Sequence, residues 1–127
     1  MKLSQPFFHL PVLFDVTRLQ AEVAALPTEA WVSHPDSLPG NSAARLISAK
    51  GAETDSVHGQ MLPTPWLKAM PYMRQLLAGF GVVWSRSRLM RLAPGAGVPE
   101  HADTNYHWHT RVRVHIPVFT NEAVRFH

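Results

Sequence analysis

The spacing of hydrophobic residues changes at Gly81, and this change limits what the chain can fold into. Before Gly81, apolar residues recur every three or four positions, which is typical of one helix face. After it they alternate with polar residues, which is typical of a half-buried strand. No internal repeat or linker separates the two parts. We therefore expect an α+β fold, mainly β, with a single domain over residues 1–127: a helical and loop part, 1–81, packed outside strands in 82–127.

Two helical regions are predicted in the first part. Asp15 is suited to be the N-cap of the first helix, and Pro27 ends it. Its apolar stripe consists of Val16, Leu19, Val23 and Leu26. Thr64 and Pro65 have the N-cap and N1 chemistry of the second helix. Pro71 should kink or divide that helix, because proline lacks an N–H group and clashes with the preceding turn.

Strand formers predict the β segments. Residues 7–14 favour an edge strand or an extended arm, because Pro11 cannot occupy a central strand position. The other expected strands are 44–48, 82–92 and 111–119.

Composition excludes several classes of protein. The chain has no cysteine, so disulfides and thiolate metal sites are impossible and a metal must be held by His, Asp or Glu. The net charge of +3 comes without the Lys/Arg runs and interleaved aromatics of nucleic-acid binders, so we expect acidic small molecules as partners and no nucleic acid. The N-terminus lacks a signal-peptide pattern and no apolar run has membrane-spanning length, so we expect a cytoplasmic protein that does not bind membranes.

His101 and Asp103 form an HxD pair after a predicted strand. Residues i and i+2 of an extended backbone point to the same side, so one imidazole and one carboxylate can bind one cation. Such a pair is two thirds of the 2-His-1-carboxylate triad of non-heme iron. The pattern is weak by itself, and a surface turn is the alternative interpretation.

Arg111, Arg113 and His115 alternate with apolar residues in the predicted strand 111–119. One interpretation is a half-exposed strand with its arginines in water. The other is a strand covered on both faces, whose buried guanidinium groups need an anion such as a dicarboxylate.

The run from residue 87 to 127, SRLMRLAPGAGVPEHADTNYHWHTRVRVHIPVFTNEAVRFH, closely resembles bacterial members of the aspartyl/asparaginyl β-hydroxylase family. The matching features are the PG before the HxD, the HxD, the RxRxHIPV segment and the TN turn followed by VRF. The resemblance implies a double-stranded β-helix (a jelly-roll, cupin-like fold) with the N-terminal helices outside. It also implies a hydroxylase that uses Fe(II) and 2-oxoglutarate on an amino-acid, peptide or protein substrate.

The resemblance assigns roles to individual residues. His101 becomes an iron ligand and Asp103 a second one, although some family members have Gly at that position. Arg113 and His115 help to hold 2-oxoglutarate or substrate, while Arg111 either lines the same cavity or faces outward. The family's second iron histidine and a further arginine lie beyond residue 127, so we expect a truncated chain with an incomplete barrel and site. Met90 also departs from the serine of the mammalian-type enzymes.

Tyr106, His107 and Trp108 lie between the HxD and the RxRxH segment, where they would form the wall of a substrate pocket; rim packing by Trp108 is the alternative. Two other functions stay open. One is a non-catalytic cupin-like module that binds a metal or an anion. The other is an inactive fragment, whose exposed sheet edge would favour aggregation or a homodimer.

Overall fold

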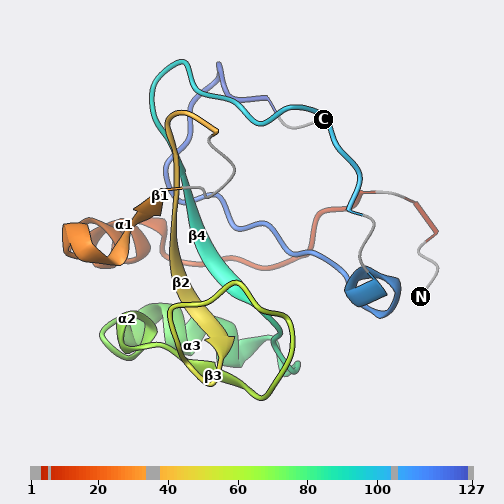
Figure 1. The fold of residues 1–127 in the computed structure, drawn as a ribbon. Helices are drawn as coiled ribbons and strands as arrows, with labels where there is room; N and C mark the ends of the chain where they lie inside the picture. The colour runs from red at the N-terminus through yellow and green to blue at the C-terminus, as the bar shows by residue number, and fades with distance from the viewer. Residues whose placement is uncertain (1–3, 6, 34–37, 104–105, 126–127) are drawn as a thin grey trace.

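The computed structural model describes residues 4–5, 7–33, 38–103 and 106–125 (Figure 1). The elements in chain order are α1 (Val16–Ala24), η1 (Thr28–Ala30), β1 (Val32–Ser33), β2 (Asn41–Ala49), β3 (Met61–Pro63), α2 (Pro65–Lys68), α3 (Pro71–Gly79), β4 (Ser87–Leu92) and η2 (Tyr106–Thr110).

Strand β2 is the centre of an open antiparallel sheet. Ala43 pairs with both Val32 of β1 and Met90 of β4, so β1 and β4 lie on opposite edges of β2. Ile47 likewise pairs with both Pro63 of β3 and Ser87 of β4. One edge of β2 is therefore taken by β4, and β1 and β3 share the other edge. The architecture is α+β with an antiparallel sheet that does not close.

The helices begin and end as local chemistry predicts. The Asp15 side chain accepts a hydrogen bond from the Arg18 backbone N–H at 3.2 Å, which confirms Asp15 as the N-cap of α1. Thr64 caps α2 in the same way, and Pro71 begins the separate helix α3, so the division predicted at this proline is confirmed. The first turn of α3 is capped by a side chain of α1. The Glu22 carboxylate accepts hydrogen bonds from the backbone N–H groups of Tyr72 and Met73, at 2.6 and 2.9 Å.

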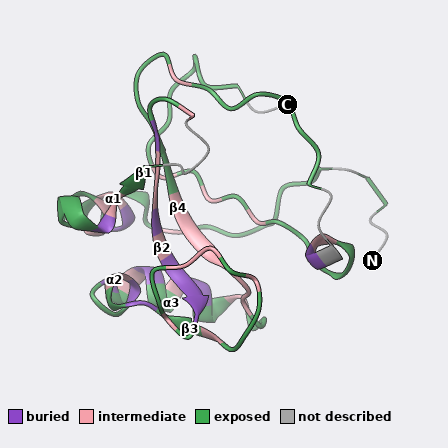
Figure 2. Ribbon diagram, viewed as in Figure 1, coloured by how far each residue is buried: buried purple, intermediate pink, exposed green. Residues whose placement is uncertain are grey.

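The hydrophobic core lies between the helices and the second half of β2 (Figure 2). Its buried members are Leu19, Leu46, Ile47, Leu67, Met70, Met73 and Leu77. The register of β2 shifts between Arg45 and Ile47, as at a β-bulge. Because this irregularity interrupts the alternation of side chains, the consecutive residues Leu46 and Ile47 both lie in the core.

Three of the expected strands need correction. Strand β2 extends beyond the predicted 44–48, and β4 occupies only the second half of 82–92. Gly81 has φ of +62° directly after α3, and the Trp84 indole N–H donates to the Leu77 carbonyl at 2.8 Å, so this segment packs back on α3 instead of joining β4.

The predicted strand 111–119 is wrong, because this segment joins no ladder in the described part of the chain. Its alternation is kept only in the later part of the segment, since Val112 is exposed like its charged neighbours. Ile116 and Val118 pack against the core, while Arg113 and His115 are exposed. The Gln20 side chain donates to the Val118 carbonyl at 2.8 Å and so fastens the segment to α1.

Residues 7–14 also join no ladder, which agrees with the extended-arm alternative (Figure 1). Among the helices of the described residues, none is long and apolar enough to cross a membrane.

Candidate functional site

His101 and Asp103 lie on the exposed segment after β4, and their side chains face each other. The His101 Nδ1 atom lies 2.9 Å from the Pro99 carbonyl oxygen. A carbonyl can only accept, so Nδ1 donates its proton and Nε2 keeps the lone pair that a metal would use. That Nε2 atom is 3.8 Å from Oδ1 of Asp103. The orientation of the ring is therefore the one that a metal-ligating histidine requires.

An imidazole nitrogen and a carboxylate oxygen suit a hard or borderline cation such as Fe(II), but they are only two of its ligands. Two ligand atoms at about 2.1 Å from one metal, at right angles, are about 3 Å apart, so the 3.8 Å separation needs only a small side-chain rotation. Within the described ranges, no group of three or more His, Cys, Asp or Glu side chains is placed to hold a metal. The described residues thus place two possible donors, those of His101 and Asp103, beside each other.

Arg113 links this pair to the predicted substrate wall. Its guanidinium forms an ion pair with Asp103 and lies over the Trp108 ring, 4.4 Å from the centroid. Four residues singled out from the sequence, His101, Asp103, Trp108 and Arg113, are therefore brought together from positions up to twelve residues apart.

Arg111 points elsewhere. Its Nη1 donates to the His107 carbonyl at 3.0 Å and to the Thr110 hydroxyl at 3.2 Å, so Arg111 caps η2 instead of lying beside Arg113. Tyr106 begins η2, and its side chain lies outside the described part of the structure. The His115 side chain lies at the surface. The part of it that is buried, and then the positive charge of Arg113, lower its pKa.

His107 is the buried titratable residue of this region. It is 8% exposed, its Nε2 lies 3.3 Å from the Ser85 hydroxyl, and its ring meets Trp108 edge to face. Burial lowers the pKa of His107, with further contributions from Arg111, Arg86 and His58. His107 therefore anchors η2 as a neutral side chain.

This anchor should make stability depend on pH. Because the folded pKa of His107 lies below its ordinary value, the unfolded chain binds the proton more readily, and the free energy of unfolding falls as pH drops below about 6.5. We expect His107→Gln to reduce the slope of that free energy between pH 7 and 5. Urea denaturation across this range measures it, and the exposed His9→Gln is the control. An unchanged slope in His107→Gln would contradict the burial argument.

A second charged cluster involves residues that sequence reasoning did not single out. Arg45 donates to both oxygens of Asp55, at 3.2 and 2.7 Å, and to Glu53 at 3.0 Å. The hydrogen bonds from Arg45 hold the pKa of Asp55 below its ordinary value. The Arg86 side chain donates to the Asp55 backbone carbonyl at 2.8 Å. Arg45 meets Glu53 and Asp55 through the loop that follows β2. Arg86, which precedes β4, reaches Asp55 because β4 pairs with β2, and no short-range pattern reveals that pairing.

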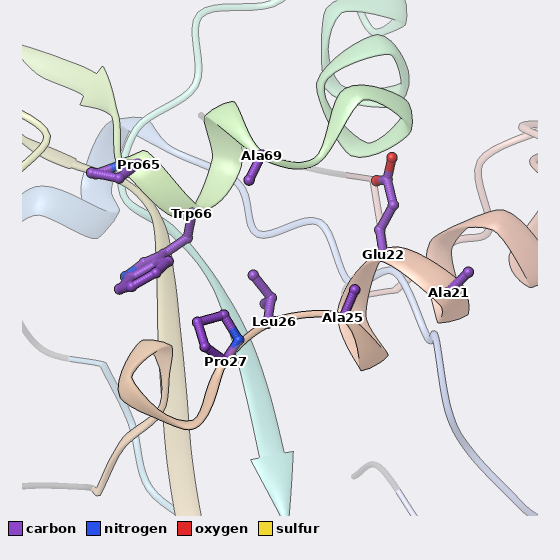
Figure 3. A pocket seen from close by; sticks show the side chains of 8 residues that line it. All are labelled: Ala21, Glu22, Ala25, Leu26, Pro27, Pro65, Trp66 and Ala69. Atoms are coloured by element: carbon purple, nitrogen blue, oxygen red, sulfur yellow. The ribbon is translucent and has the colours of Figure 1, made fainter.

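A shallow groove lies between the end of α1 and α2 (Figure 3). Its lining residues are Ala21, Glu22, Ala25, Leu26, Pro27, Pro65, Trp66 and Ala69. Its one carboxylate, that of Glu22, is already engaged by the α3 backbone. None of the site residues expected from the sequence lines it, so we assign it no chemistry.

Comparison of the chain with protein-family models, with curated proteins and with solved structures gives no match. A functional assignment must therefore start from the sequence motifs and from the geometry of these residues.

Proposed function

We propose that the protein is an Fe(II)- and 2-oxoglutarate-dependent hydroxylase that acts on an aspartyl, asparaginyl or other amino-acid or peptide substrate. The observation that carries the proposal is the cluster of His101, Asp103, Trp108 and Arg113, in which the metal-ligand pair, a cation and an aromatic wall adjoin. The RxRxHIPV and HxD motifs support the same assignment, since they resemble those of the aspartyl/asparaginyl β-hydroxylases.

In this proposal His101 and Asp103 hold the iron. The Pro99 carbonyl fixes the tautomer of His101, so that Nε2 is the ligand atom. The open sheet of β1–β4 would be part of a jelly-roll barrel, with α1, α2 and α3 outside it. Iron with 2-oxoglutarate would supply the oxidative chemistry, in which oxygen hydroxylates an unactivated carbon while 2-oxoglutarate is decarboxylated to succinate.

The surrounding side chains bind and orient the organic molecules. Arg113 presents a planar guanidinium whose remaining donors suit a carboxylate of 2-oxoglutarate, and His115 lies two residues further along the same exposed side. Trp108 keeps Arg113 in place through its ring face and excludes water from one side of the guanidinium. Trp108 would form the wall against which the substrate lies, and the buried His107 would hold η2 in place behind it.

The proposal is tested by anaerobic titration of the protein with Fe(II) and 2-oxoglutarate, followed by the visible metal-to-ligand charge-transfer band. We expect a band in the wild type and none in His101→Ala, because the variant lacks the oriented Nε2 donor. His9→Ala, at an exposed position of the N-terminal arm, should keep the band. A band that survives in His101→Ala, or no band in either the 127-residue chain or a version extended past residue 127, would contradict the proposal.

A cupin-like binding module without catalysis is the second candidate. The observation that favours it is the ion pair of Asp103 with Arg113, which neutralises one of the two metal donors. Turnover separates the two functions: a hydroxylase converts 2-oxoglutarate to succinate when iron and substrate are present, whereas a binding module does not.

A further inference from the structure

Arg45 and Arg88 form an unusual pair across the sheet. They are directly opposite in the antiparallel register of β2 and β4, where like charges destabilise the pairing. Both side chains are substantially buried, with 11% and 29% of their surfaces exposed. Burial of two opposed guanidinium groups requires counter-charge nearby.

The available counter-charge is unequally shared. Arg45 takes a two-point contact with Asp55 and a further one with Glu53. The Nη1 atom of Arg88 lies 3.5 Å from Oδ1 of Asp55. Among the described residues this is the sole ionic contact of Arg88, and no hydrogen bond from its guanidinium is found there. A guanidinium has five N–H donors, so most donors of Arg88 have no protein acceptor among the described residues and can serve a ligand.

The charge of the cluster is also unbalanced. Arg45, Arg86 and Arg88 meet two carboxylates, those of Glu53 and Asp55, which leaves one excess positive charge. Burial and the like charges of Arg86, Arg113 and Arg45 lower the pKa of Arg88. An anion that binds here would relieve this repulsion.

The cluster interacts electrostatically with the site already described. Arg113, which pairs with Asp103, lies within electrostatic reach of Arg88, and Arg86 lies within reach of His107. The cluster is thus coupled to the His101–Asp103 pair electrostatically, through Arg113.

We propose that Arg88, with Arg86 beside it, forms a binding site for a small carboxylate, and that this carboxylate is the acid group of the substrate. The planar fork of Arg88 matches a carboxylate in two-point geometry, whereas Asp55 leaves that fork largely free. The assignment of the carboxylate to the substrate rests on the proposed function. The carboxylate site itself needs no metal.

The test is calorimetric titration of the metal-free protein with succinate at low ionic strength. We expect saturable binding, weakened at least about tenfold in Arg88→Gln, because a two-point charged hydrogen bond is lost. The matched control is Arg91→Gln on the same strand, since the Arg91 guanidinium bonds to Ser42 and lies over the Trp31 ring outside the cluster. The uncharged diamide of succinic acid should not bind.

Two further variants keep the proposal open to refutation. If Arg88→Gln does not fold, Arg88→Lys retains the charge but not the planar fork, and it should bind succinate more weakly than the wild type. Succinate binding that is lost in Arg113→Gln but retained in the Arg88 variants would overturn the site. Inorganic phosphate that binds more tightly than succinate would overturn the carboxylate assignment.

The outcome is distinguishable from that of the proposed function. If the charge-transfer band fails to appear while Arg88-dependent succinate binding is intact, the hydroxylase proposal fails and the carboxylate site stands. If the band appears but Arg88→Gln binds succinate like the wild type, the carboxylate site fails and the metal site stands.

Discussion

Leu19→Ala is expected to lower the free energy of unfolding by about 3 kcal/mol, because it removes a fully buried side chain and leaves a cavity. Leu19 has no exposed surface and belongs to the cluster that joins α1 to Leu46 and Ile47 of β2. The neighbours come from separate elements that are held by the sheet and by the capped helices, so they cannot collapse fully into the space. Urea denaturation of the wild type and variant measures the difference.

The chain provides a matched control in Leu13→Ala. This substitution removes the same atoms from a side chain that is fully exposed on the N-terminal arm. Its effect should stay within about 0.5 kcal/mol. Equal effects of the two substitutions would show that α1 does not dock on the sheet as described.

The helices could be predicted because their signals are local. A carboxylate at Asp15 and a hydroxyl at Thr64 can cap only the turn that follows them. Pro71 cannot continue a preceding helix, because it lacks the N–H group, but it can begin a new one. Glu22 is different. It caps α3 from a helix about fifty residues earlier in the sequence, and no spacing rule indicates such a contact.

The strands were harder because a strand exists only with a partner. The alternation in 111–119 predicts the inward packing of Ile116 and Val118 but not the exposure of Val112. Alternation indicates burial and not hydrogen bonding. Strand β3 has no alternating pattern that would predict it. It is short and ends in Pro63, and it is extended because it pairs with the end of β2.

The candidate site divides in the same way. His101 and Asp103 are two residues apart, so an extended backbone is sufficient to place them together. Arg113 was placed in this region by its motif, whereas the outward turn of Arg111 towards the η2 backbone was not foreseen. The convergence of Arg45 and Arg88 on Asp55 depends on the register of β2 and β4 and on the loop after β2 that carries Asp55.

Arg113→Gln should affect the two ligands of the proposed hydroxylase differently. Arg113 now competes with any cation for Asp103, so its removal frees the carboxylate, and Fe(II) affinity without 2-oxoglutarate should be unchanged or higher. The affinity for 2-oxoglutarate should fall by a factor of about 10 to 100, because a charged hydrogen-bond donor worth about 1.5–3 kcal/mol is lost.

Separate titrations measure these two effects: Fe(II) alone, and 2-oxoglutarate at saturating Fe(II) under anaerobic conditions. Arg125→Gln is the control, since Arg125 bonds to the Glu122 carbonyl near the end of the described chain. If Fe(II) affinity falls with that for 2-oxoglutarate, Arg113 supports the metal pair structurally and does not hold the cosubstrate. If neither affinity changes, the ion pair with Asp103 is a surface contact without a binding role. A loss of 2-oxoglutarate affinity without a loss of Fe(II) affinity therefore separates a ligand-binding arginine from a structural one.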